Sequence, residues 1–192
     1  HYESGELASH DPYTNGLKGN AEPYRPISVF RTYESHVMQV RPWLPKAIGE
    51  VTYLAMGMAD LSVYVPIYSS MSAYPKHWGE GTDKADSSSL YWKFRKLQTL
   101  VMTDYPKLAP IVTKAYADFE KDLAKRQAAF EAEYVKTVKT DPKKAQADLD
   151  HFSIQAMADA EALTEDLLNQ VFTVRTEDIQ KVNFFANRSK KD

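Results

Sequence analysis

The hydrophobic and polar positions divide the chain into three regions with different periodicities. Residues 1–26 contain three glycines and three prolines among Asn, Asp and Ser, and their apolar positions follow no period. These turn-forming residues predict a loop segment. Residues 27–68 contain short runs rich in Val, Ile, Tyr and Thr separated by Pro or Gly, which predicts strands. Residues 86–173 repeat apolar positions every three or four residues, which predicts helices.

The strand region contains candidate strands at residues 27–32, 36–41, 51–56 and 62–67. Their connections are too short for crossover helices, so neighbouring strands should pair antiparallel. Residues 69–85 lose the alternation and include Pro75, Gly79 and Gly81, which predicts a loop before the helices.

The first two predicted helices are bounded by capping residues and prolines. Asp86 and Ser87 are good N-cap residues for the first helix. Because proline interrupts helices, Pro106 and Pro110 should separate the first helix from the second.

A third helix should return antiparallel to the second. Asp141 followed by Pro142 places an N-cap residue before a proline at the first helical position. The apolar stripe of this helix comprises Leu149, Phe152, Ala156, Ala160, Leu163, Leu167 and Val171. The sequence therefore predicts an α+β fold, with an antiparallel sheet followed by long antiparallel helices, in a single unit over residues 1–192.

The charge balance and hydropathy limit the classes of partner that the chain can bind. Lys and Arg total 24 against 26 for Asp and Glu, and no basic stripe is available to neutralise phosphates. No apolar run approaches the roughly 20 residues that cross a bilayer, and the first residues lack the layout of a signal peptide. We expect no nucleic-acid partner, no membrane partner and a cytoplasmic location.

The residue types also limit the chemistry. The chain has no cysteine, so it carries no disulfide, thiolate metal site or cysteine nucleophile of its own. Its five histidines are scattered, without a pair at helical spacing. We expect no metal site and no organic cofactor.

One polar run, from Arg31 to His36, gathers candidate binding residues. In an extended chain, Glu34 and His36 share one face with Thr32, and Arg31 lies on the other. A buried arginine needs a carboxylate partner, and the C-terminal carboxylate of a peptide is one such partner. An internal carboxylate such as Glu34 is the alternative.

The same run carries a resemblance to a known family. The stretch YRPISVFRTYESHVMQVRP at residues 24–42 resembles the centre of bacterial dipeptidases of the dipeptidase A type. Segments 53–57, 62–68 and 91–97 resemble later parts of the same family in the same order. Members are similar in fold to N-terminal-nucleophile hydrolases, in which two antiparallel sheets lie between helical layers.

The resemblance implies a cysteine-type dipeptidase. In this family an N-terminal cysteine attacks the peptide carbonyl, and its own α-amino group is the base, which titrates near pH 8. Because this chain has no cysteine, we expect it to be the C-terminal portion of a larger enzyme, inactive alone and partnered by the missing N-terminal part. A homo-oligomer is compatible with these features.

The resemblance also implies the site residues. By position, Arg31 corresponds to the arginine beside the nucleophile in related acylases. We assign dipeptide binding to Arg31, Glu34 and His36, and no catalytic or metal-binding residue to this chain.

Two other interpretations stay open. The chain could be a free-standing interaction module whose helical hairpin presents a partner surface. It could also be a different hydrolase that uses Ser35 or Glu34 with His36. However, Ser35 and His36 should point to opposite faces of a strand, and the pair Glu34 and His36 lacks a nucleophile.

Overall fold

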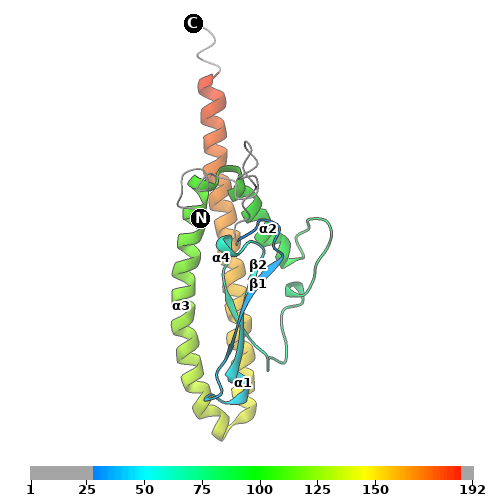
Figure 1. The fold of residues 1–192 in the computed structure, drawn as a ribbon, viewed down its shortest axis with the longest axis vertical. Coiled ribbons are helices and arrows are strands. Elements are labelled where there is room, and N and C mark those ends of the chain that lie inside the picture. Colours follow the sequence, from blue (N-terminus) through cyan, green and yellow to red (C-terminus); the bar gives the residue numbers. More distant parts are fainter. Residues whose placement is uncertain (1–27, 187–192) are drawn as a thin grey trace, which may run out of the picture.

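A computed structural model describes residues 28–186, with side chains described through residue 181 (Figure 1). The predicted loop at residues 1–26 lies outside this range. The sheet comprises β1 (Glu34–Val40), β2 (Glu50–Met56) and β3 (Val65–Tyr68), in that spatial order. Both pairs are antiparallel, as the short connections predicted.

The predicted strand at residues 27–32 is wrong within the described residues. Residues 30 and 31 form a turn, and the amide of Thr32 donates to the carbonyl oxygen of Val29 at 2.9 Å. The carbonyl oxygens of Phe30 and Thr32 accept hydrogen bonds from the guanidinium of Arg95. Because a side chain satisfies these two acceptors, the segment does not need a neighbouring strand.

The helices are α1 (Lys46–Gly49), α2 (Leu90–Val101), α3 (Tyr105–Thr140) and α4 (Pro142–Ala186), with short 3₁₀ turns η2 (Ala59–Leu61), η3 (Lys76–Trp78) and η4 (Met102–Asp104). The boundary between α3 and α4 is as predicted, because the carboxylate of Asp141 accepts from the amide of Lys144 at 2.9 Å. The described residues are therefore a sheet followed by helices, an α+β arrangement.

Two predicted helix boundaries are wrong. Helix α2 begins at Leu90, after Ser89 at the N-cap position, because the carboxylate of Asp86 accepts from the amides of Ser88 and Ser89 and closes a turn there. Pro110 lies inside α3 rather than before it. It sits in the second turn, where a proline removes only a single backbone hydrogen bond.

The long helices α3 and α4 form a hairpin along which the sheet lies (Figure 1). Helix α3 has 36 residues and is therefore about 54 Å long. Helix α2 packs on α4, and the C-terminal part of α4 extends beyond the other elements. The sheet thus has one helical layer among the described residues.

The core has two apolar clusters, a larger one between α2, the segment that joins β2 to β3 and the α3–α4 hairpin, and a smaller one between the sheet and the hairpin. The rings of Phe130 on α3 and Phe152 on α4 stack with centroids 4.5 Å apart, and Tyr68 of β3 lies 5.9 Å from Phe130. Ala156 and Ala160 are fully buried in the hairpin, as the predicted stripe required. Burying this stripe supplies most of the stability of such long helices.

Candidate functional site

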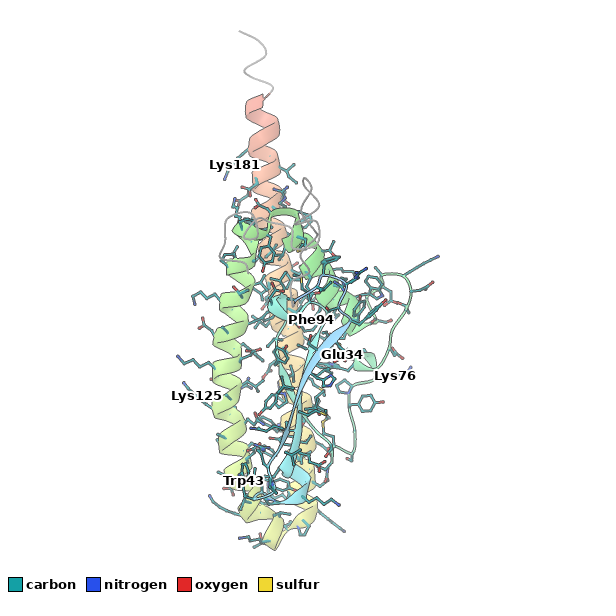
Figure 2. All side chains as sticks on the ribbon, in the orientation of Figure 1. Glu34, Trp43, Lys76, Phe94, Lys125 and Lys181 are labelled. Atoms are coloured by element: carbon teal, nitrogen blue, oxygen red, sulfur yellow. The ribbon has the colours of Figure 1, made fainter. Side chains whose placement is uncertain are left out.

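Glu34 and His36 come together at the start of β1. Figure 2 labels Glu34 at this end of the strand. The Nδ1 atom of His36 lies 3.0 Å from Oε2 of Glu34, and both side chains are close to half exposed. Alternation along the strand places them on the same face, as the sequence predicted. Ser35 points to the opposite face, so it does not share a proton with His36.

Arg31 lies on the turn that leads into β1, and its side chain is exposed. The condition of an arginine buried at a strand end, which would need a carboxylate partner, therefore does not apply to Arg31. Because β1 begins only at Glu34, Arg31 lies outside the strand. Strand alternation therefore does not fix the direction of the Arg31 side chain relative to Glu34. Arg31 is separated from Glu34 by two residues and occupies the same end of the sheet.

A tight turn after β2 supports this end of the sheet. Gly57 has φ of 77°, and its amide donates to the carbonyl oxygen of Tyr33 at 2.7 Å. Gln98 of α2 is fully buried beneath it, where its side-chain amide donates to the carbonyl oxygen of Met56 at 3.0 Å and accepts from the amide of Met58 at 3.1 Å. The backbone around Tyr33 is thus fixed from below by α2.

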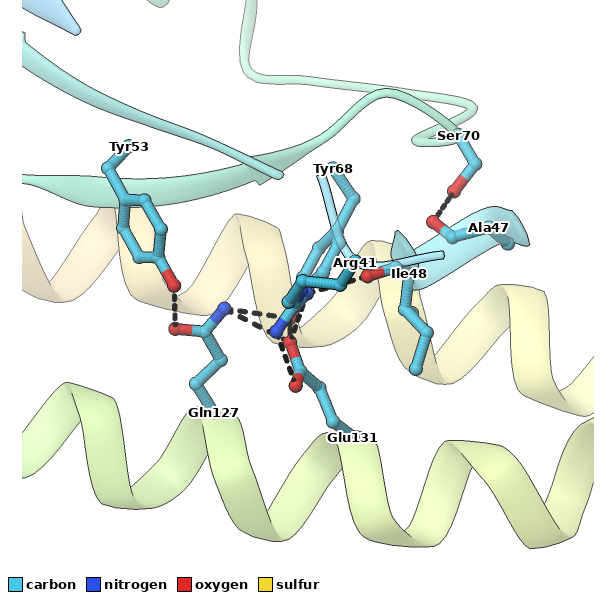
Figure 3. A network of polar contacts seen from close by, with 8 residues as sticks. All are labelled: Arg41, Ala47, Ile48, Tyr53, Tyr68, Ser70, Gln127 and Glu131. Atoms are coloured by element: carbon cyan, nitrogen blue, oxygen red, sulfur yellow. Dashed lines mark hydrogen bonds and ion pairs between the residues drawn. The ribbon is translucent and has the colours of Figure 1, made fainter. Parts of the chain in front are cut away.

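A buried polar cluster joins the far end of β1 to α3 (Figure 3). Both terminal nitrogens of Arg41 donate to Glu131 at 2.8 Å, and the hydroxyl of Tyr68 donates to the same carboxylate at 2.5 Å. Gln127 donates to Tyr68 and accepts from the hydroxyl of Tyr53. Burial and the adjacent Glu131 carboxylate raise the pKa of Tyr68, so its phenol stays protonated and donating.

This cluster is a structural link rather than a second binding site. The seven residues of β1 separate it from Glu34 by about 20 Å. Sequence reasoning missed it because Arg41 and Glu131 are 90 positions apart and neither belongs to a recognisable motif.

A second charged cluster fastens the loop after β3. The carboxylate of Glu161 on α4 contacts Nε2 of His77 at 2.7 Å and Nζ of Lys93 at 2.5 Å. Burial would raise the pKa of Glu161, but the hydrogen bonds and charges of Lys93 and His77 hold it below its ordinary value. The loop, α2 and α4 are therefore joined through one carboxylate.

The described part of the chain shows neither a metal-binding cluster nor a membrane-spanning helix. Among residues 28–186, no group of three or more His, Asp or Glu side chains is arranged to hold a metal ion. None of the helices described has a stretch apolar and long enough for a bilayer span.

Comparison with known sequences identifies the family. The sequence pattern of Peptidase family C69 matches residues 1–118, more than half of the chain. The chain belongs to Peptidase family C69. A probable dipeptidase of Salmonella dublin is 54% identical over 84 residues, which are 44% of this chain and 17% of that protein.

Two further relatives are more distant. A probable dipeptidase of Latilactobacillus sakei is 28% identical over 124 residues, 65% of this chain and 25% of the relative. Dipeptidase A of Lactobacillus helveticus is 27% identical over 106 residues, 55% of this chain and 22% of the relative. The chain thus matches a quarter or less of the length of these relatives.

Proposed function

We propose that this chain is the C-terminal portion of a cysteine-type dipeptidase, and that the exposed end of β1 with its preceding turn binds the dipeptide. Membership of Peptidase family C69 is the observation that carries the proposal. The relatives named above are called dipeptidases, and the matched region is a small part of their length.

The charges at this end of the sheet complement a dipeptide, which carries one carboxylate and one ammonium group. Arg31 supplies a permanently ionised, planar donor for the carboxylate. Glu34 supplies an acceptor for the ammonium group, and the contact from Nδ1 of His36 orients the Glu34 carboxylate. These residues bind and orient the substrate, and none of them is a nucleophile.

The covalent step belongs to a cysteine upstream of this chain. Its thiol passes a proton to the α-amino group, and the sulfur attacks the peptide carbonyl carbon. The C–N bond breaks, the departing amine takes the proton, and water then cleaves the thioester to release the second amino acid. No metal or organic cofactor takes part in the proposed reaction.

The exposed edge of the sheet is evidence that further structure packs on it in the full-length protein. β1 is an edge strand among the described residues, and Met38 and Val40 on the same face as Glu34 are 71% and 68% exposed. Such an edge is usually covered in a native protein. We propose that the upstream region covers it and completes a two-sheet sandwich between helical layers.

A direct test compares three proteins in a dipeptide-hydrolysis assay. The isolated chain should be inactive, a full-length protein with a cysteine-bearing upstream region should turn over dipeptides, and its Cys→Ser variant should lose that activity. Turnover by the pure 192-residue chain would refute the proposal.

The binding role of Arg31 is tested in the active full-length protein. Arg31→Lys keeps the charge but loses the planar fork, so kcat/KM should fall by about 10- to 1000-fold with the thermal midpoint nearly unchanged. Arg175→Lys on α4 is the matched control and should behave as wild type. A lowered midpoint with wild-type kinetics in Arg31→Lys would show that Arg31 is structural.

A further inference from the structure

Arg95 of α2 is a buried cation whose partners are almost all in the turn that carries Arg31. Its residue is 7% exposed. One terminal nitrogen donates to the carbonyl oxygen of Phe30, and the other donates to that of Thr32 at 2.8 Å. These two carbonyl groups belong to the residues immediately before and after Arg31.

Aromatic side chains also contact the Arg95 guanidinium. The guanidinium of Arg95 lies 4.7 Å from the ring centroid of Phe30 and 5.3 Å from that of Tyr91, and its Nε donates to the Tyr91 hydroxyl at 3.1 Å. The Tyr91 ring in turn lies 5.8 Å from the ring of Tyr33. The contacts with Phe30 and Tyr33 therefore tie the residues on both sides of Arg31 to α2, while Arg31 itself is exposed.

The charge of Arg95 is not balanced in the way that a structural arginine usually is. Among the side chains described, residues 28–181, no carboxylate lies at ion-pair distance from it. Arg41 in the same chain shows the usual arrangement, a bidentate pair with the carboxylate of Glu131. Burying a cation without a carboxylate partner is costly, so this geometry depends on the fit of the planar fork to two backbone acceptors and on the adjacent Phe30 and Tyr91 rings.

From this geometry we infer that Arg95 is a positioning residue for substrate binding. It fixes the turn that carries Arg31 and thereby positions the Arg31 guanidinium to bind the dipeptide carboxylate. The inference rests on the binding role proposed for Arg31. Preorganising the turn avoids the entropic cost of ordering it when substrate binds. Lysine cannot replace Arg95, because one ammonium group does not match two diverging carbonyl groups.

The structural part is tested by hydrogen exchange in the 192-residue chain. Arg95→Lys should accelerate exchange of the Thr32 amide by about tenfold, with exchange in α3 and α4 unchanged. Lys96→Arg is the control, because it makes the opposite substitution at the next position of α2, which is exposed. It should leave the exchange rate of the Thr32 amide unchanged. Unchanged protection of Thr32 in Arg95→Lys would overturn the inference.

The functional part is tested in the active full-length protein. Arg95→Lys should raise KM for a dipeptide by about 5- to 50-fold and change kcat much less, because the lost order weakens binding rather than chemistry. Wild-type KM in Arg95→Lys beside an impaired Arg31→Lys would overturn the inference and leave the proposed function standing. Wild-type kinetics in Arg31→Lys would instead refute the binding role of Arg31, and the inference with it.

Discussion

Gly57 occupies a position at which any side chain is strained. Its φ of 77° is unfavourable for L-residues, and a Cβ there would overlap the side-chain amide of buried Gln98. Gly57→Ala should therefore lower the free energy of unfolding by about 1 to 3 kcal/mol, measured by urea unfolding. Gly81→Ala is the control, because no atom lies within 4 Å of its added Cβ. Equal unfolding midpoints for the two variants would contradict this account of the turn.

Glu131 is the carboxylate on which the buried cluster depends. Glu131→Gln removes its charge and leaves the Arg41 guanidinium without a counter-ion at a site where both side chains are almost buried. We expect a loss of about 3 kcal/mol in the free energy of unfolding. Glu133→Gln on the same helix breaks only an exposed pair with Lys136 and should change stability by less than about 0.5 kcal/mol. Similar losses in both variants would mean that the buried pair contributes little.

At the scale of elements, the sequence predicted what depends on neighbouring residues. The β-branched and aromatic residues of β2 and the cap and proline at Asp141 and Pro142 are local signals, and the structure confirms both elements. The residues of the turn before β1 favour extended backbone, so their sequence predicts a strand that the structure does not have. Its conformation is set by Arg95, more than 60 positions away, which no local pattern could reveal.

The candidate site likewise has features that follow from local sequence and features that depend on distant contacts. The shared face of Glu34 and His36 follows from their spacing along one strand, so the sequence could predict it. The exposure of Arg31 and the pair between Arg41 and Glu131 depend on how α2 and α3 pack against the sheet. Such contacts between distant positions follow from the whole fold, and residue types alone do not specify them.

The junction of the loop after β3 with α2 and α4 should depend on pH through Glu161. Because Lys93 and His77 lower the pKa of folded Glu161, its charged form stabilises the fold above the unfolded pKa, and this contribution is lost as the pH falls through the folded pKa. Glu161→Gln should therefore lower the free energy of unfolding at pH 7, and the difference from wild type should shrink below about pH 4.

Denaturant unfolding at several pH values measures this difference. Glu165→Gln is the control, because the Glu165 side chain is 64% exposed and its carboxylate lies 3.9 Å from Nζ of Lys93, farther than that of Glu161. It should have little effect at any pH. A Glu161→Gln difference that stays constant from pH 7 to low pH would contradict an electrostatic role for Glu161.

At the scale of the whole molecule, the edge strand β1 is the feature that a larger protein would use. Within residues 28–186 its outer edge pairs with no other strand, and Val37, Met38 and Val40 are each more than half exposed. An edge that combines unpaired backbone groups with apolar side chains is a template for pairing with another chain. The isolated chain should therefore associate as its concentration rises, which light scattering measures.

Changing Met38 and Val40 together to Lys should suppress that association, because charged side chains on an edge oppose strand pairing. Phe172→Lys is the control, since Phe172 is also exposed, at 61%, but lies on α4. In a full-length protein whose upstream region covers β1, the same double change should instead lower the thermal midpoint, because it buries two charges without partners. Association of the isolated chain that Phe172→Lys abolishes and the double change does not would place the contact on α4. A full-length protein whose midpoint is insensitive to the double change would show that the upstream region leaves β1 uncovered.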